Sequence, residues 1–77
     1  MAPLRPGDCV RVPDGRPGRV RGSSGGKYRI RVRRFGSAAD EFLLLSRREL
    51  QRIDPPAGWM SREGYNRRLA ATRRRRG

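Results

Sequence analysis

Arginine occupies every second position in the most regular stretch of the chain. In residues 27–34, Arg29, Arg31 and Arg33 alternate with one tyrosine and two β-branched residues. A period of two places alternate side chains on opposite faces of a β-strand, so the three arginines share one face. A guanidinium group can bind phosphate through two parallel hydrogen bonds, whereas a lysine ammonium acts as a hydrated point charge. This stretch therefore predicts a strand with an apolar inner face and an outer face suited to a polyanion.

Two earlier stretches carry the same alternation. Arg11 lies between two valines, and Arg19 and Arg21 flank Val20. If the three strands are neighbours, their arginines project from one outer surface. Such positions could be ordinary solvated strand positions, but like charges on adjacent strands repel by a few tenths of a kcal/mol per pair, and nearby acids are few. An external polyanion is the simpler explanation. The predicted phosphate-binding residues of this surface are Arg11, Arg19, Arg21, Arg29, Arg31, Arg33 and Arg34.

A second group of arginines lies near the end of the sequence. It comprises Arg67, Arg68, Arg73, Arg74, Arg75 and Arg76. A run of like charges repels itself, so we expect residues 73–77 to be disordered without a partner. Such runs often wrap phosphate backbones, and they also serve at membrane surfaces or as solubilising tails. No helix with a large apolar face accompanies this run, which argues against a membrane contact.

The overall composition favours binding and argues against catalysis. Twenty Lys and Arg stand against 7 Asp and Glu, which gives a formal charge of +13. A GC-rich genome would favour arginine over lysine but would not by itself produce this net charge. With no histidine and one cysteine, the usual zinc sites and Cys-His or Ser-His pairs cannot form within one chain. The seven acidic residues are scattered, without the spacing for acid-base catalysis. We expect no enzymatic activity, metal, cofactor or small-molecule substrate.

The cysteine content also bears on location. A single cysteine, Cys9, allows no internal disulfide, which is typical of the reducing cytoplasm, and we expect it to be a small buried or half-buried residue. No apolar run approaches the 18 residues of a membrane span, and the first residues lack the pattern of a signal peptide. The expected location is the cytoplasm.

Five aromatic residues could stack on bases. Tyr28 and Phe42 are predicted core residues, whereas Trp59 and Tyr65 are predicted to pack. Phe35 is the candidate for stacking, with anchoring of its loop as the alternative. With few exposed aromatics and many arginines, binding should be mostly to phosphates, with little sequence specificity and a strong dependence on salt.

Turn residues divide the first two-thirds of the chain into short strands, which indicates an all-β domain. Clusters of Gly, Pro, Asp and Ser separate the apolar stretches. Ser46 and Glu49 have the spacing of a capping box, which predicts one helical turn between the fourth and fifth strands. The predicted strands span residues 8–12, 18–22, 27–34, 41–45 and 51–53. The apolar run at 42–45 predicts a strand covered on both faces, or one close to the C-terminal segment.

Five short strands with a one-turn helix before the last strand resemble the SH3-like small barrels, and among them the KOW and Tudor type. The residues that carry the resemblance are 7–12, 18–20, 28–32 and 49–50, within the first 54 residues. The resemblance implies a five-stranded barrel, a fold that hosts many unrelated ligands. The chain lacks the aromatic cluster of methyl-lysine cages and the aromatic groove of peptide-binding SH3 domains, so neither ligand is carried over.

The composition changes after the barrel, which gives two predicted parts, residues 1–54 and 55–77. Residues 55–58 form a Pro-rich linker, and Ser61 could cap a short helix that reaches to about residue 74. The helix carries few apolar residues, and they either dock on the barrel beside Leu43 and Leu45 or bind a partner. These candidate partner-binding residues are Trp59, Met60, Tyr65 and Leu69.

Two functions follow as hypotheses. The first is a nucleic-acid-binding accessory protein that contacts the phosphate backbone of DNA or RNA through the arginine face and the basic C-terminal tail. The alternative is a protein-interaction module, a small subunit of a larger nucleoprotein complex that docks through residues 59–69. A third class, the plasmid-type dihydrofolate reductases that build a pore from several barrels, has a characteristic Val-Gln-Ile-Tyr segment that is absent here.

Overall fold

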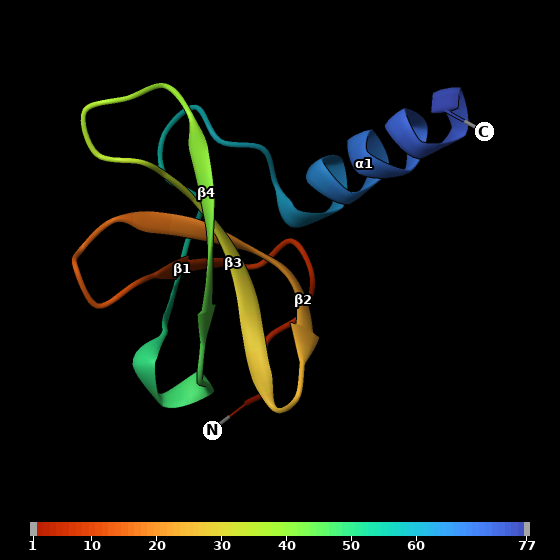
Figure 1. Cartoon of the computed structure of the whole chain (residues 1–77). Helices are drawn as coiled ribbons and strands as arrows, with labels where there is room; N and C mark the ends of the chain where they lie inside the picture. The colour runs from red at the N-terminus through yellow and green to blue at the C-terminus, as the bar shows by residue number, and fades with distance from the viewer. Residues whose placement is uncertain (1, 77) are drawn as a thin grey trace.

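The alternation of apolar and polar residues produces five strands in the computed structural model, which describes residues 2–76, with side chains to residue 71. They form one antiparallel sheet of order β4-β3-β2-β1-β5, with β4 and β5 at its edges (Figure 1). A one-turn 3₁₀ helix, η1, precedes the last strand, and one α-helix follows. The elements are β1 (Cys9–Arg11), β2 (Pro17–Ser24), β3 (Lys27–Arg33), β4 (Asp40–Leu45), η1 (Arg47–Glu49), β5 (Gln51–Ile53) and α1 (Arg62–Arg76). The β-rich architecture and the order of elements are confirmed.

The inner face of the sheet forms one apolar core. Val10, Val20, Ile30 and Val32 are fully buried, and Leu4, Val12 and Leu50 complete the cluster. Tyr28, Leu43 and Leu45 pack against it, and the Tyr28 hydroxyl accepts a hydrogen bond from the backbone N–H of Leu4 at 3.2 Å. The inward members of the predicted alternation all belong to this core, and they are Val10, Val12, Val20, Tyr28, Ile30 and Val32. Burial of each large apolar side chain contributes about 1.5–3 kcal/mol, so this cluster stabilises the sheet.

Gly18 permits close contact between β2 and the core. It is the Cα partner of Val32 on β3. A Cβ atom at this position would lie 2.6 Å from Cγ2 of Ile30 and 2.7 Å from Cγ1 of Val32. The space that a side chain would occupy is therefore already filled by two core residues.

Strand β4 differs from the prediction. Leu43 and Leu45 pack on the core, but Phe42 is 49% exposed and Leu44 is 53% exposed. The prediction that this strand is covered on both faces is wrong, as is the assignment of Phe42 to the core. The reason is that β4 is an edge strand whose outer face the C-terminal segment does not cover (Figure 1).

The N-terminal part of α1 is attached to the sheet, and the rest of the helix extends away from it (Figure 1). Ser61 caps the helix, since its Oγ accepts a hydrogen bond from the N–H of Gly64 at 3.1 Å. Asn66 Nδ2 donates to the carbonyl oxygen of Pro6 at 3.1 Å, and Arg62 lies 3.8 Å from the buried Asp8 carboxylate. The helical backbone continues through Arg76. The disorder of residues 73–77 without a partner stays a prediction. No helix in the described residues is long and apolar enough to cross a membrane.

Candidate functional site

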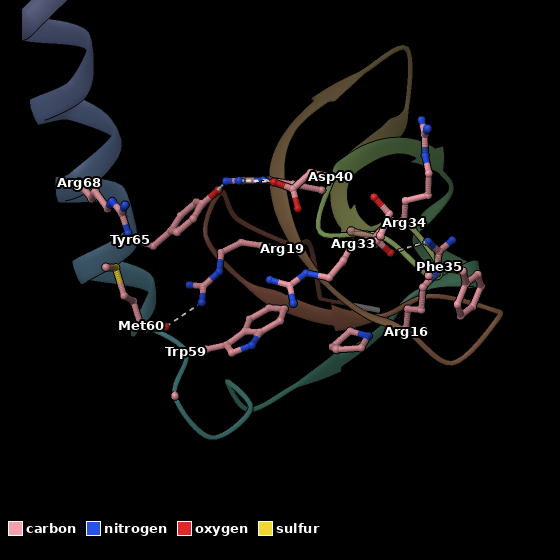
Figure 2. Close-up of a pocket in the computed structure, with 16 residues that line it drawn as sticks. Arg16, Arg19, Arg33, Arg34, Phe35, Asp40, Trp59, Met60, Tyr65 and Arg68 are labelled. Carbon is pink, nitrogen blue, oxygen red and sulfur yellow. Dashed lines mark hydrogen bonds and ion pairs between the residues drawn. The ribbon is translucent and has the colours of Figure 1, made fainter.

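A pocket of about 900 Å³ lies where the outer face of the sheet, the β3–β4 loop and residues 58–68 meet. Figure 2 shows side chains from all three regions around it. β2 contributes Arg19 and β3 contributes Arg31 and Arg33, while Trp59 and Tyr65 come from the C-terminal segment. Trp59, Met60 and Tyr65 of this segment contact Arg19 on β2, so the segment forms one side of the pocket.

Arg19 joins the C-terminal segment to the sheet. Its guanidinium donates hydrogen bonds to three carbonyl oxygens, at 3.2 Å to Gly7, 2.8 Å to Met60 and 3.4 Å to Ser61. Its Cζ lies 4.4 Å from the ring centroid of Tyr65 and 5.4 Å from that of Trp59. The residue is only 5% exposed. The prediction that Arg19 projects into solvent from an open face is therefore wrong, because two aromatic rings and three carbonyls cover it.

The aromatic residues after the linker dock at a position that the sequence did not predict. Trp59 and Tyr65 pack on the sheet, as one of the two alternatives held, but against Arg19 and not beside Leu43 and Leu45. The one available signal was the position of two aromatic residues just after a linker, which does not identify their target. Met60 stays exposed and Leu69 is half-buried. Partner binding by Trp59, Met60, Tyr65 and Leu69 remains a prediction.

Arg31 is partly neutralised. Its Nε donates to Oδ2 of Asp40 at 2.8 Å, its Nη2 forms an ion pair with the same carboxylate, and its Nη1 donates to the Tyr65 hydroxyl at 3.4 Å. The hydrogen bond to Tyr65 and then the contact with Asp40 raise the pKa of Arg31 above its usual value. Phosphate would have to compete with Asp40 for this side chain, so Arg31 is a weaker candidate than its position on the strand predicted.

Arg16 organises the loop side of the pocket. It pairs with Asp14 and Glu41 at 2.7 Å each, and its Cζ lies 4.4 Å from the ring centroid of Phe35. These hydrogen bonds, first that with Asp14 and then that with Glu41, raise the pKa of Arg16. The contact anchors Phe35, as one alternative predicted, but 68% of Phe35 remains exposed. Arg34 lies 3.9 Å from the other oxygen of Glu41.

Five of the predicted sheet arginines form no ion pair within residues 2–71: the buried Arg19 and four others, Arg11, Arg21, Arg29 and Arg33. Arg21 and Arg29 lie over the exposed ring of Phe42, with Cζ to centroid distances of 5.7 and 4.6 Å. Arg33 is exposed and lines the pocket. Arg11 is exposed near the β1–β2 turn, where its Nη1 donates to the carbonyl oxygen of Gly15 at 3.1 Å. These four arginines therefore lie in three places: Arg21 and Arg29 beside Phe42, Arg33 at the pocket, and Arg11 near the β1–β2 turn.

Only two of the six C-terminal arginines have side chains among the described residues. Arg67 and Arg68 are exposed on α1, and Arg68 lines the pocket. The side chains of Arg73, Arg74, Arg75 and Arg76 lie outside the described residues. Their proposed contact with phosphate therefore stays a prediction from sequence.

Cys9 lies on the same side of the sheet as Arg19, because the two are Cα partners on neighbouring strands. The residue is buried, as predicted, and burial raises the pKa of its thiol, an effect that the nearby Arg19 charge opposes. Among the side chains of residues 2–71, no group of three His, Cys, Asp or Glu could hold a metal ion.

Comparison with protein-family models, curated proteins and solved structures finds no match to this chain.

Proposed function

We propose that this chain is a non-enzymatic nucleic-acid-binding accessory protein that contacts the phosphate backbone with little sequence specificity. The observation that carries the proposal is the group of Arg21, Arg29 and Arg33, none of which has a carboxylate partner within residues 2–71. Two of them lie over an exposed aromatic ring. An aromatic ring holds a guanidinium in place without neutralising its charge, so these arginines remain available to phosphate.

The distribution of acidic residues supports the same role. Asp40 is used by Arg31, and Asp14 and Glu41 are used by Arg16. The acidic residues near this surface therefore neutralise arginines other than Arg21, Arg29 and Arg33. A phosphate backbone would supply the counter-charges that the described part of the chain lacks.

The proposal includes the finer fold assignment, an SH3-like small barrel. The strand order, the position of η1 between β4 and β5, and one core shared by residues of β1 to β4 support it.

The test is a salt series with a labelled duplex and a labelled single strand, read by fluorescence anisotropy. Replacing Arg21, Arg29 and Arg33 together by Gln should weaken binding about 10- to 100-fold near 0.1 M salt. It should also reduce the slope of log affinity against log salt concentration by roughly 3, about one for each phosphate contact. Arg31 is left in place because its removal would also release Asp40 and Tyr65.

The matched control replaces three exposed arginines outside the proposed surface, Arg5, Arg48 and Arg52, by Gln. It lowers the formal charge by the same amount, from +13 to +10. The control should retain most of the affinity. Equal losses in the two triple variants would show that net charge alone drives binding and would remove the proposed site. Absence of salt-dependent binding by the unmodified chain would reject the function itself.

A further inference from the structure

The pocket beside the free arginines combines an exposed aromatic surface with positive charge. Arg19 lies over the Trp59 ring, yet Trp59 remains 39% exposed and lines the pocket. A base can stack on an indole, a contact that tolerates any base because every base has a π-face. Trp59 thus supplies a platform that phosphate contacts alone would not require.

The pocket is lined on one side by a buried cation, Arg19. Arg19 is buried, and in residues 2–71 it contacts carbonyl oxygens and aromatic rings but no carboxylate. A charge that is buried without a counter-ion is costly unless its hydrogen bonds are satisfied. The three carbonyls meet that need while leaving the charge in place, so the pocket keeps a positive potential that favours an anionic occupant.

The rim of the pocket provides a contact for phosphate. Arg33 extends from the end of β3 toward Trp59 (Figure 2). It is exposed and forms no ion pair with any described residue. The side chain of Arg34, next to it, lies 3.9 Å from the Glu41 carboxylate. An anion at the mouth of the pocket would therefore meet Arg33 without first displacing a carboxylate.

We infer that this pocket holds one unpaired nucleotide of a nucleic-acid strand, with its base against Trp59 and its phosphate on Arg33. The volume, about 900 Å³, falls within the range of about 300–1,000 Å³ that is common for small-ligand sites. Negative charge on the phosphate complements Arg33 and Arg19, and the planar base complements the indole. This inference rests on the proposed function and narrows it to a preference for single strands over a blunt duplex.

The preference follows from the geometry of paired bases. A base inside a duplex is stacked and paired, and its extrusion costs a few kcal/mol. A single strand offers free bases without that cost, while both forms offer phosphates to Arg21 and Arg29. The two nucleic acids should therefore share the phosphate surface and differ in the use of the pocket.

The test uses the intrinsic fluorescence of Trp59, which is the single tryptophan of the chain. The full chain is titrated with an unlabelled single strand, a blunt hairpin duplex of matched phosphate number, and a nucleoside monophosphate. Binding of the single strand and of the duplex is followed in parallel by the fluorescence anisotropy of labelled versions of each. The single strand should change the Trp59 emission as it binds, whereas the blunt duplex should bind with little change.

Variants test the residues separately. Trp59→Ala should weaken single-strand binding about 5- to 100-fold and leave duplex binding nearly unchanged, because it removes one stacking contact. Trp59→Leu keeps an apolar side chain over Arg19, so it should show the same selective loss if the alanine variant folds poorly. Arg33→Gln should weaken single-strand binding more than Arg48→Gln, a control with the same change of charge on the exposed surface.

The outcomes separate this inference from the proposed function. If neither the single strand nor the duplex binds, the proposed function fails and the inference fails with it. If the single strand and the duplex both bind, and Trp59 emission is unchanged or changes equally with both, only the nucleotide pocket is overturned. If the monophosphate gives the full change of Trp59 emission at micromolar concentration, the pocket is a site for a free nucleotide, and its assignment to a strand is overturned.

Discussion

The guanidinium of Arg19 on β2 lies over the indole of Trp59, 5.4 Å from the ring centroid, and donates a hydrogen bond to the carbonyl oxygen of the next residue, Met60, at 2.8 Å. One buried side chain thus connects the centre of the sheet to a segment about half the chain away. The same contact builds the wall of the candidate pocket. Arg19 therefore contributes both to the packing of the C-terminal segment and to the candidate pocket.

Replacing Arg19 by Lys should destabilise the protein by about 1–3 kcal/mol. An ammonium group cannot reach Gly7 and Met60 with the same fork of donors or stack flat on Tyr65, so buried carbonyl oxygens would lose partners. Urea unfolding monitored by circular dichroism measures the change. Arg52→Lys, at an exposed position of β5, is the matched control and should stay within about 0.5 kcal/mol of the unmodified chain. A similar small effect for Arg19→Lys would contradict the structural role of this residue.

Gly18→Ala should lower the free energy of unfolding by about 1–3 kcal/mol, because the new methyl group would overlap core atoms of Ile30 and Val32 at 2.6 and 2.7 Å. Gly22→Ala lies on the same strand, has no neighbour within 4 Å of the new Cβ, and should be nearly neutral. Thermal and urea unfolding of the two variants give the comparison. Equal stability of the two would show that β2 does not approach the core as described.

Because of the Cys9 thiol, the free energy of unfolding should fall as the pH rises into the alkaline range. Burial raises the pKa of the folded thiol above its ordinary value of 9.0. Below pH 9 the thiol is protonated in both the folded and the unfolded chain, so its contribution to the free energy of unfolding is complete. As the pH rises above about 9, the unfolded chain ionises first, so the free energy of unfolding falls until the folded thiol also ionises. Urea unfolding between pH 7 and 10.5 should show a steeper decline for the unmodified chain than for Cys9→Ala.

The same burial predicts slow chemistry at Cys9. A thiol-specific reagent should modify the folded chain far more slowly than the urea-unfolded chain at pH 8, because both access and thiolate formation are suppressed. Equal rates in the folded and unfolded chains would show that the thiol is accessible.

A chain that ends at Ala71 tests the basic end of α1. It loses four arginines, Arg73, Arg74, Arg75 and Arg76, but keeps the anchoring residues of the first turn. If these arginines contact phosphate, the slope of log affinity against log salt should decrease by up to roughly 4, at about one per contact. Unfolding in urea should be nearly unchanged. An unaltered slope would confine the interface to the sheet and the pocket.

Local patterns determined most of the fold. Alternation in residues 27–34 determined β3 and the burial of Ile30 and Val32, because one face of a strand must be removed from water. The one-turn helix η1 was also predicted from a local pattern, the capping box of Ser46 and Glu49. The N–H and hydroxyl of Ser46 both donate to Oε1 of Glu49, at 3.0 and 2.8 Å, and η1 begins at the next residue.

The candidate site depended on contacts between distant residues. The alternation of arginines along β2 and β3 and the excess of positive charge could be predicted from the amino-acid sequence. The sequence could not show that Trp59 and Tyr65 would cover Arg19, that Asp40 would pair with Arg31, or that Phe42 would stay exposed on an edge strand. Alternation specifies which face a side chain is on, whereas the tertiary structure decides which other segment, if any, covers that face. That choice separated Arg19 and Arg31, which bind other segments of the chain, from Arg21, Arg29 and Arg33, which form no ion pair with a described residue.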